Sequence, residues 1–562
     1  MPRHTQISMA YQHHSSLEQT PATAAPDLLL LNANVLTLEP QPSRAEAVAI
    51  RGQTIMAVGH RKEVVFLAGP GTRTIDCEGM TLLPGFIDAH CHLLATAASM
   101  QGLHCGPEAV SSIADLQRAV RSRAEGTLLG RWIRGFGYDD FDLKERRHPT
   151  RWDLDSAAPQ HPVRLEHRSG HATVLNSQGL LLAGINQDTP DPIDGVIARD
   201  EATGEPTGLL LEMAGYLRKR LGEDRSEADL AESMTRLNRT VLSYGITSIQ
   251  DAGPNNGPER WQTFQKLRAS GHLAPRVTMM AGAGHLSQFL TEGSLWGDGD
   301  QWLRLGHVKV MLTLTTGVLQ PDANSLRELV AWARRASFPV AIHAVEQEAV
   351  AAAAQALLEV PTGRRSSDPP RHLFREGGFA GPPRDRIEHC SECPPEVMAK
   401  VRRSGAMVVT QPGFVFWRGD SYRERVDASL LDWLYPVGSL ARSGVSVAFG
   451  SDSPVIDLNP WPGIYSAVTR ATTSGAGLGG IGDGGPAHSQ KVPVEAALRM
   501  FTLGGAYAEG SGAVKGSIRR GKLADLVLVD KNPVGIDPLD LKTVRPMLTI
   551  LGGQVVWEAG RS

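Results

Sequence analysis

Cysteine is scarce in this sequence. Five of its 562 residues are cysteines, at positions 77, 91, 105, 390 and 393. An odd number of cysteines in a long chain fits a reducing compartment better than a disulfide framework, so we expect a cytoplasmic protein. Cys390 and Cys393 form a Cys-x-x-Cys pair, but the sequence holds no second such pair to complete a structural zinc site. A zinc or redox role for this pair is the weaker alternative.

Long hydrophobic runs and an excess of one charge are also missing. No apolar run approaches the roughly 20 residues that a membrane-spanning helix needs. The formal net charge is only -3, which argues against a nucleic-acid-binding surface. Residues 1–27 are polar and lack the apolar core of a secretion signal, so we expect a flexible tail there. These absences favour a globular protein whose partner is a small-molecule substrate, with no nucleic acid and no membrane.

Strand-like segments stand at both ends of the remaining chain. Short apolar runs separated by turn residues fill residues 28–58, and residues 524–530 and 549–557 have the same character. The two ends, 28–84 and 508–562, are therefore predicted to form one small composite β domain, a β-sandwich, beside the middle of the chain.

The middle of the chain, residues 85–507, alternates strand-like runs with helical patterns. One helix is predicted to begin at Ser226, to carry apolar residues at helical spacing and to end at Gly245. Eight parallel strands with intervening helices predict an α/β fold, the TIM (β/α)8 barrel. The expected strands are Phe86–Ala89, Gly245–Asp251, Arg276–Met280, His307–Leu312, Pro339–Val345, Arg386–Cys390, Ala406–Gln411 and Ser446–Gly450.

Long segments interrupt this alternation. About residues 101–224 separate the first and second expected strands, which is far more than an ordinary connection. We expect this insertion to form a subdomain that covers the mouth of the barrel. Residues 361–383 and the glycine-rich residues 473–486 are expected to be loops, either mobile lids or ordinary surface segments.

The first expected barrel strand delivers two histidines, His90 and His92. Side chains two positions apart on a strand point to the same side, so the two imidazoles could bind one metal ion. Two unrelated histidines near a strand end would look the same. The later strands decide between these readings.

Further residues of metal-binding types occur at or near the carboxyl ends of later strands, where barrel enzymes build their active sites. They are Lys309 in the fourth strand, His343 in the fifth, His389 in the sixth and Asp452 just after the eighth. Four histidines, a lysine and an aspartate at one face favour a metal site over unrelated buried polar residues.

With these motifs the sequence resembles the amidohydrolase superfamily of metal-dependent hydrolases, in the YtcJ-like branch that includes N-substituted formamide deformylases. The resemblance covers about residues 28–558. The motifs that carry it are LLPGFIDAHCH at 82–92, GEPTGLLLE at 204–212, YGITSIQD at 244–251, VK at 308–309, AIHA at 341–344, RIEH at 386–389, GSDSPV at 450–455, AVTR at 467–470 and GSIRRGKLADLVLVDKNP at 516–533.

The resemblance implies two metal positions, one on His90, His92 and Asp452 and the other on His343 and His389. In binuclear relatives a carboxylated lysine bridges the two ions, and Lys309 is the matching position. A plain ion pair or a vestigial lysine is the alternative. A histidine-rich set favours zinc, one or two ions per chain, although manganese, iron or cobalt suit similar ligands.

The resemblance also implies a reaction. A metal-activated hydroxide would attack an amide-type C–N bond, N-acyl or N-formyl, with Asp452 as general base and then general acid. The alternatives are hydrolysis of an ester, lactone or carbamate on the same site, or a catalytically silent scaffold. Such barrels commonly associate, and a homodimer is possible.

Residues of the insertion are candidates for substrate contact. They are His171, Tyr138 and Arg168, which could equally well pack the subdomain itself. Where relatives often carry Asp-Gly-His, this chain has Ser169 before Gly170 and His171, so no particular substrate can be transferred to it.

Two further residues near the expected site have open roles. Trp417, after the seventh strand, could form an apolar wall of the pocket or belong to the core. Glu388, beside His389, could orient a metal ligand or pair with Arg386.

Overall fold

The computed structural model of the protein describes residues 25–560, except 42, 193–194, 223–226, 315–316, 362–383 and 480–488. Several expected features therefore lie outside the described residues: most of the tail, the helix start at Ser226, nearly all of the 361–383 loop and the second half of the glycine-rich loop. Asp27, expected in the tail, donates its backbone N–H to the carbonyl oxygen of Ile50 (2.8 Å), just before the first strand begins at Leu28.

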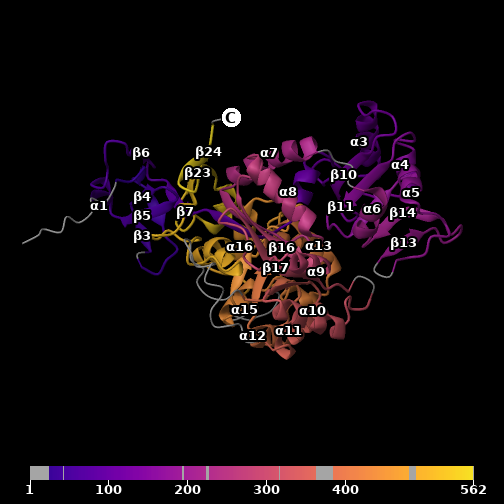
Figure 1. The fold of residues 1–562 in the computed structure, drawn as a ribbon. Helices are drawn as coiled ribbons and strands as arrows, with labels where there is room; N and C mark the ends of the chain where they lie inside the picture. The colour runs from indigo at the N-terminus through magenta and orange to yellow at the C-terminus, as the bar shows by residue number, and fades with distance from the viewer. Residues whose placement is uncertain are drawn as a thin grey trace, which may run out of the picture.

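Eight parallel strands form the central sheet, in the order β21-β20-β19-β18-β17-β16-β15-β8 (Figure 1). Nearly every strand residue is buried, because helices cover the outer face and side chains fill the interior. The predicted barrel is confirmed, with all eight strands near their expected places. They are β8 (Phe86–Cys91), β15 (Ile246–Asp251), β16 (Arg276–Gly282), β17 (Leu303–Met311), β18 (Val340–Ala344), β19 (Arg386–His389), β20 (Met407–Thr410) and β21 (Val447–Phe449).

The barrel closes where β21 approaches β8. Asp452 N–H donates to the carbonyl oxygen of His90 (2.7 Å), and His92 N–H donates to that of Ser453 (2.8 Å). Gly450 makes this approach possible, since a Cβ atom there would lie 2.6 Å from the backbone nitrogen of His90. The candidate ligands His90 and Asp452, distant in sequence, are thereby brought side by side.

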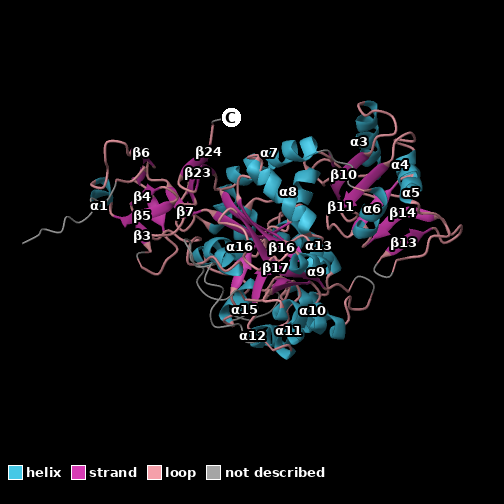
Figure 2. Ribbon diagram, in the orientation of Figure 1, coloured by secondary structure: helices cyan, strands magenta, loops and turns pink. Residues whose placement is uncertain are grey.

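Helices surround the barrel strands, as the cyan ribbons around the magenta strands show (Figure 2). The helix predicted to end at Gly245 is α7 (Glu227–Ser243), which buries Met234, Leu237 and Val241 in the barrel core. The other helices are α2 (Leu93–Ser99), α8 (Pro258–Ala269), α9 (Leu286–Thr291), α10 (Ala323–Arg335), α11 (Gln347–Glu359), α12 (Pro395–Ser404), α13 (Gly413–Arg425), α14 (Ala428–Leu431), α15 (Val437–Arg442), α16 (Pro460–Thr469), α17 (Val494–Arg499) and α18 (Gly505–Ala508).

Two smaller sheets lie at the left of Figure 1 and share one hydrophobic core. The first has the order β5 (Thr54–Gly59), β4 (Ala47–Arg51), β1 (Leu28–Leu31) and β6 (Arg73–Asp76), with α1 (Arg61–Val65) against it. The second has the order β24 (Gln554–Glu558), β23 (Pro546–Leu551), β22 (Leu526–Val529), β7 (Thr81–Pro84), β2 (Asn34–Leu36) and β3 (Arg44–Ala45), and so joins strands from both chain ends.

Residues 509–515 close the amino-terminal end of the barrel. Glu509 accepts a hydrogen bond from Thr278 (2.6 Å) and pairs with Lys515 (2.6 Å), whose amine also donates to Ser248 (2.8 Å). All four side chains are buried. These contacts put this segment with the barrel, whereas the predicted division assigned it to the small β domain.

The long segment between β8 and β15 contains a sheet of its own, at the right of Figure 1. Its strand order is β13 (Val196–Arg199), β14 (Pro206–Leu211), β12 (Ala172–Leu175), β11 (Val163–His167), β10 (Ile133–Tyr138) and β9 (Leu103–His104). Four helices accompany it: α3 (Ile113–Glu125), α4 (Arg151–Asp155), α5 (Ser177–Ala183) and α6 (Ala214–Leu221).

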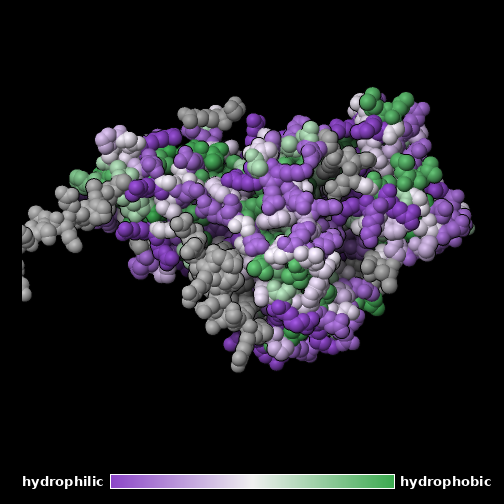
Figure 3. Space-filling view, in the orientation of Figure 1, coloured by the Kyte–Doolittle hydropathy of each residue, from purple (hydrophilic) through white to green (hydrophobic). Residues whose placement is uncertain are grey.

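The face of the molecule in Figure 3 is mostly hydrophilic, with hydrophobic residues in small separate patches. Among the described residues, no helix has both the length and the hydrophobicity needed to cross a bilayer.

Candidate metal centre

The expected ligands converge at the carboxyl-terminal end of the barrel. A cavity of about 2030 Å³ lies between this end and the insertion, lined by residues of both. Its wall includes His92, Lys309, His343, His389 and Asp452. The sixth expected ligand, His90, is fully buried just beneath them.

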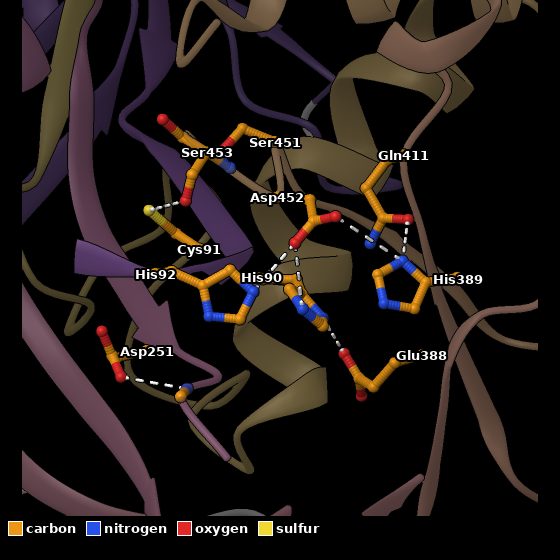
Figure 4. Close-up of polar contacts among 12 residues, drawn as sticks. His90, Cys91, His92, Asp251, Glu388, His389, Gln411, Ser451, Asp452 and Ser453 are labelled. Carbon is orange, nitrogen blue, oxygen red and sulfur yellow. Dashed lines mark hydrogen bonds and ion pairs between the residues drawn. The ribbon is translucent and has the colours of Figure 1, made fainter. Parts of the chain in front are cut away.

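Three of the ligands form a tight group on adjoining strand ends (Figure 4). Asp452 Oδ1 lies 3.0 Å from His92 Nε2 and 3.4 Å from His90 Nε2. Two imidazole nitrogens and a carboxylate oxygen at such spacing form a donor set suited to a transition-metal ion such as zinc. Both imidazoles face the same carboxylate, as predicted, although β8 ends at Cys91 and His92 is the N-cap of α2.

His389 and His343 lie next to this group. The ring centroids of His389 and His90 are 4.7 Å apart, and those of His343 and His389 are 4.4 Å apart. Asp452 Oδ2 lies 4.0 Å from His389 Nδ1, so the aspartate stands between the two groups of histidines.

Several buried donor atoms of this centre have no hydrogen-bond partner in the described part of the chain. They are His90 Nε2, His389 Nε2 and Lys309 Nζ. A buried polar atom without a partner is costly, and such atoms point to a missing ion or group. The residues present therefore fit a bound divalent cation.

Glu388 contacts both a candidate metal ligand and Arg386, the two partners that the sequence left open. Its Oε2 lies 2.5 Å from His90 Nδ1, and Arg386 donates to both of its carboxylate oxygens (2.7 and 2.9 Å). Because a carboxylate only accepts, the His90 proton is on Nδ1 and Nε2 keeps a lone pair for a metal. The amide oxygen of Gln411, 2.9 Å from His389 Nδ1, fixes that ring in the same way.

Burial sets the protonation states of these groups. It holds the pKa values of His90 and His343 well below the ordinary value and lowers that of His389 to about 4. Burial also lowers the pKa of Lys309 to about 8. Neutral imidazoles are the form that binds metal, and a lysine must be neutral to react with carbon dioxide.

Asp452 is the exception among these buried groups. Burial acts to raise its pKa, but the hydrogen bond from His92 and the charges of the neighbouring histidines outweigh burial, so its pKa is below the usual range. Its φ of 60°, like the 68° of His389, lies in the left-handed region that residues other than glycine rarely adopt. Backbone strain of this kind accumulates at functional sites.

The three expected substrate contacts have different surroundings. His171 and Arg168 line the cavity, with Arg168 paired to Asp142 (3.5 Å). Tyr138 is fully buried, and its hydroxyl lies 3.1 Å from His148 Nδ1. Its place on β10 turns it into the core of the insertion, so the described Tyr138 has no access to the cavity and the predicted contact is wrong.

Trp417 lines the cavity and is partly exposed there, as expected for an apolar wall. Cys390 and Cys393 are free, buried thiols. The sequence interpretation missed Gln411 and Glu212. Glu212 ends the GEPTGLLLE motif, which was the available signal, and it accepts from His171 Nδ1 (2.8 Å).

A second group with metal-ligand spacing, Asp139, Asp140 and His167, lies in the insertion. Both carboxylates are also paired with arginines of α13: Arg418 contacts Asp139 and Arg425 lies 3.3 Å from Asp140. These ion pairs neutralise the aspartates and join the insertion to the barrel.

Comparison with known proteins places these features in a family. Over most of its length the chain is similar to N-substituted formamide deformylase of Arthrobacter pascens, with 28% identity covering 95% of this chain and 98% of the relative. It is also similar to the putative amidohydrolase YtcJ of Bacillus subtilis, with 26% identity covering 93% and 98%.

Solved structures show the same fold. An uncharacterized metal-dependent hydrolase from Pyrococcus horikoshii OT3 superposes with a TM-score of 0.69 at 22% identity, covering 91% of this chain and 99% of that one. Residues 73–557 match the model of the amidohydrolase family, a span that contains all six expected ligands. The chain is therefore a member of the amidohydrolase family.

Proposed function

We propose that the protein is a metal-dependent hydrolase that cleaves an amide-type C–N bond of a small molecule, N-acyl or N-formyl. The observation that carries this proposal is a set of buried nitrogen atoms at the large cavity or just beneath it, which have no hydrogen-bond partner among the described residues. The similarity to an N-substituted formamide deformylase supports an amide as the bond that is cleaved.

The proposed metal sites divide the six residues between two ions. His90, His92 and Asp452 would hold one ion, and His343 and His389 a second. Lys309, as a carbamate, would lie between them, and its buried amine with a pKa lowered to about 8 supports that modification. Zinc suits the histidine-rich set. When bound, a divalent cation supplies Lewis acidity and lowers the pKa of water at the site.

The chain's own residues would orient the reactants and move the proton. Asp452, ionised at neutral pH, would accept the proton of the attacking water and deliver it to the departing nitrogen. Glu388 and Gln411 hold His90 and His389 with their Nε2 atoms toward the site. Trp417 would provide apolar surface for the substrate's N-substituent.

The two parts of the chain outside the barrel have different proposed roles. We propose that both chain ends, residues 28–84 and the C-terminal strands, form a supporting β domain. The insertion, about residues 101–224, would be the cover of the substrate cavity, because its residues form one wall of that cavity.

Hydrolysis of formanilide (N-phenylformamide), measured through the release of aniline, tests the function. Zinc-loaded protein is expected to release aniline, a chelator to abolish the release and added zinc to restore it. Asp452→Asn should abolish hydrolysis, whereas Asp537→Asn, a matched change at the N-cap of a distant 3-10 helix, should not. Hydrolysis of p-nitrophenyl acetate but of no amide would favour the esterase alternative. If removal of the metal leaves the hydrolysis of both formanilide and p-nitrophenyl acetate unchanged, the proposal is wrong.

A further inference from the structure

The cavity holds a histidine–glutamate pair that belongs to the insertion and not to the barrel. His171 Nδ1 lies 2.8 Å from Glu212 Oε1. Because the carboxylate only accepts, the proton between them is on Nδ1, and Nε2 is the ring nitrogen left for a substrate. Both residues line the same cavity as Lys309, His389 and Asp452.

The backbone builds this pair. Strands β12 and β14 run antiparallel with Ala172 opposite Leu211, so His171 and Glu212 are the next facing positions beyond the ladder. The backbone N–H of Glu212 donates to the carbonyl oxygen of His171 (2.8 Å), which fixes the register of the two side chains. The pair is therefore preorganised by a sheet, which a chance surface contact would not be.

Glu212 shares a backbone feature with the metal-binding face. Its φ is 55°, in the left-handed region, as are those of His389 (68°) and Asp452 (60°). None of these residues is a glycine, and such conformations persist where the surrounding structure requires them, often at active sites.

The pair faces the barrel ligands across the cavity. The ring centroid of His171 lies 6.2 Å from that of His343. The side chain of His171 is 39% exposed although the residue lies inside the cavity, so a bound molecule can reach it. A substrate carbonyl held between the barrel ligands and the insertion would meet this imidazole.

We propose that His171 is a catalytic residue that donates a hydrogen bond from Nε2 to the carbonyl oxygen of the substrate, with Glu212 as its positioning residue. This inference rests on the proposed amide hydrolysis. Donors aimed at an oxygen that gains negative charge stabilise the transition state more than the ground state. A donor at Nε2 requires the doubly protonated imidazole, because Nδ1–H already donates to Glu212. Burial acts to lower the pKa of His171, but the hydrogen bond and the charge of Glu212 outweigh burial and raise it, which favours this form.

The same arrangement makes the insertion part of the active site. Asp139, beside the insertion strand β10, is ion-paired with Arg418 of α13, whose neighbour Trp417 lines the cavity. This contact holds the insertion, and with it His171, against the barrel.

Kinetics of formanilide hydrolysis test the role of the pair in zinc-loaded protein. His171→Ala is expected to lower kcat by about 10²–10³-fold with a much smaller change in KM, as for removal of an oxyanion donor. Glu212→Gln should lower kcat less, and added imidazole should restore part of the activity of His171→Ala but none of that of Asp452→Asn. The zinc content and the Tm of both variants should match the wild type. His60→Gln is the matched control. His60 also pairs with a glutamate, with its Nδ1 3.6 Å from Glu46 Oε2, but this pair is exposed on the small β domain.

A binding measurement keeps failure of this inference distinct from failure of the proposed function. Calorimetric titration of zinc-loaded protein with acetohydroxamate, an anionic oxygen ligand, needs no turnover. The Kd for acetohydroxamate should rise by about tenfold or more in His171→Ala, because a charged hydrogen bond is lost. It should also rise in Glu212→Gln. If wild type cleaves no amide yet this difference is seen, the function is wrong and the anion contact stands. Unchanged kcat or unchanged Kd in His171→Ala overturns the assignment.

Discussion

Glu388→Gln tests whether the Glu388 carboxylate holds His90 in the tautomer that can bind a metal ion through Nε2. The glutamate is fully buried, 2.5 Å from His90 Nδ1, and both of its oxygens accept from Arg386. Glutamine has the same shape but only one accepting oxygen. If that oxygen faces Arg386, the amide NH₂ group faces His90 Nδ1 and forces the ring proton onto Nε2, the atom needed for the metal. If it faces His90, Arg386 loses an acceptor.

Loss of a carboxylate that orients a metal-binding histidine typically costs 10–100-fold in metal affinity, or about 1.4–2.7 kcal/mol. The metal-free protein should also lose about 1–3 kcal/mol of unfolding free energy, because a buried hydrogen-bonding group of Arg386 or His90 is left unsatisfied. Fully breaking a buried ion pair would cost more, but glutamine retains part of the contact.

Competition for zinc with a chromophoric chelator gives the affinity, and urea unfolding gives the stability. Glu396→Gln, at an exposed position in the first turn of α12, is the control and should change neither. Zinc affinity in Glu388→Gln within twofold of the wild type would refute the claim that this carboxylate sets the tautomer of His90.

Three other predictions concern the frame around the site. Burial acts to raise the pKa of Glu509, but its buried lysine and arginine neighbours outweigh it and lower the pKa to about 2 from an ordinary 4.5. The folded-state pKa is depressed, so the stabilisation is complete above pH 4.5 and lost as pH falls toward 2. Glu509→Gln should cost about 3–5 kcal/mol at pH 7 and flatten that dependence in urea unfolding. Arg418→Ala leaves Asp139 buried without its partner on α13. Amide hydrogen exchange of β10 should therefore accelerate, while that of β18 stays unchanged. If β10 is as well protected in Arg418→Ala as in the wild type, this ion pair does not hold the insertion against the barrel. Gly450→Ala places a Cβ atom 2.6 Å from the backbone of β8, so both zinc content and Tm should fall. Gly444→Ala should lower Tm alone, because it has free space but a φ of 84°.

Most of the barrel could be predicted from sequence because its strands are buried on both faces and read as short apolar runs. The main error was at β17, which begins at Leu303 and not at His307. The first half of β17 does not read as an apolar run, because it contains Arg304 and the Gly306–His307 pair. Arg304 is nevertheless buried and donates a hydrogen bond to the backbone of Glu509. That contact joins residues about 200 apart, which no local pattern reveals.

The convergence of the candidate ligands could be predicted for a similar reason. Their positions at strand ends follow from strand alternation and from barrel geometry, as His90, His92 and Asp452 show. Residues that act through the ligands were harder to find. Gln411 lies outside the recognised motifs, and Glu212 ends one without any sign of its partner. Only the packing of β19 against β20 and of β12 against β14 brings each to its histidine.

The direction of the Tyr138 side chain could not be predicted from the sequence. Its motif placed it near polar residues, but one position along a strand decides whether a side chain faces the core or a cavity. The insertion has an irregular β10–β11 register between Phe136 and Tyr138, which the sequence alone does not reveal.

The most direct test of the central claim is metal content per chain, measured by mass spectrometry on protein purified without chelator, with wild type and Lys309→Ala in parallel. We expect about two zinc equivalents in the wild type and a clear loss in Lys309→Ala, with carbon dioxide required to refill the second site of metal-free wild type. One equivalent that is unchanged in Lys309→Ala would contradict the lysine bridge and leave a single-metal hydrolase. No metal in a correctly folded wild type would mean that the protein is not a metal-dependent hydrolase.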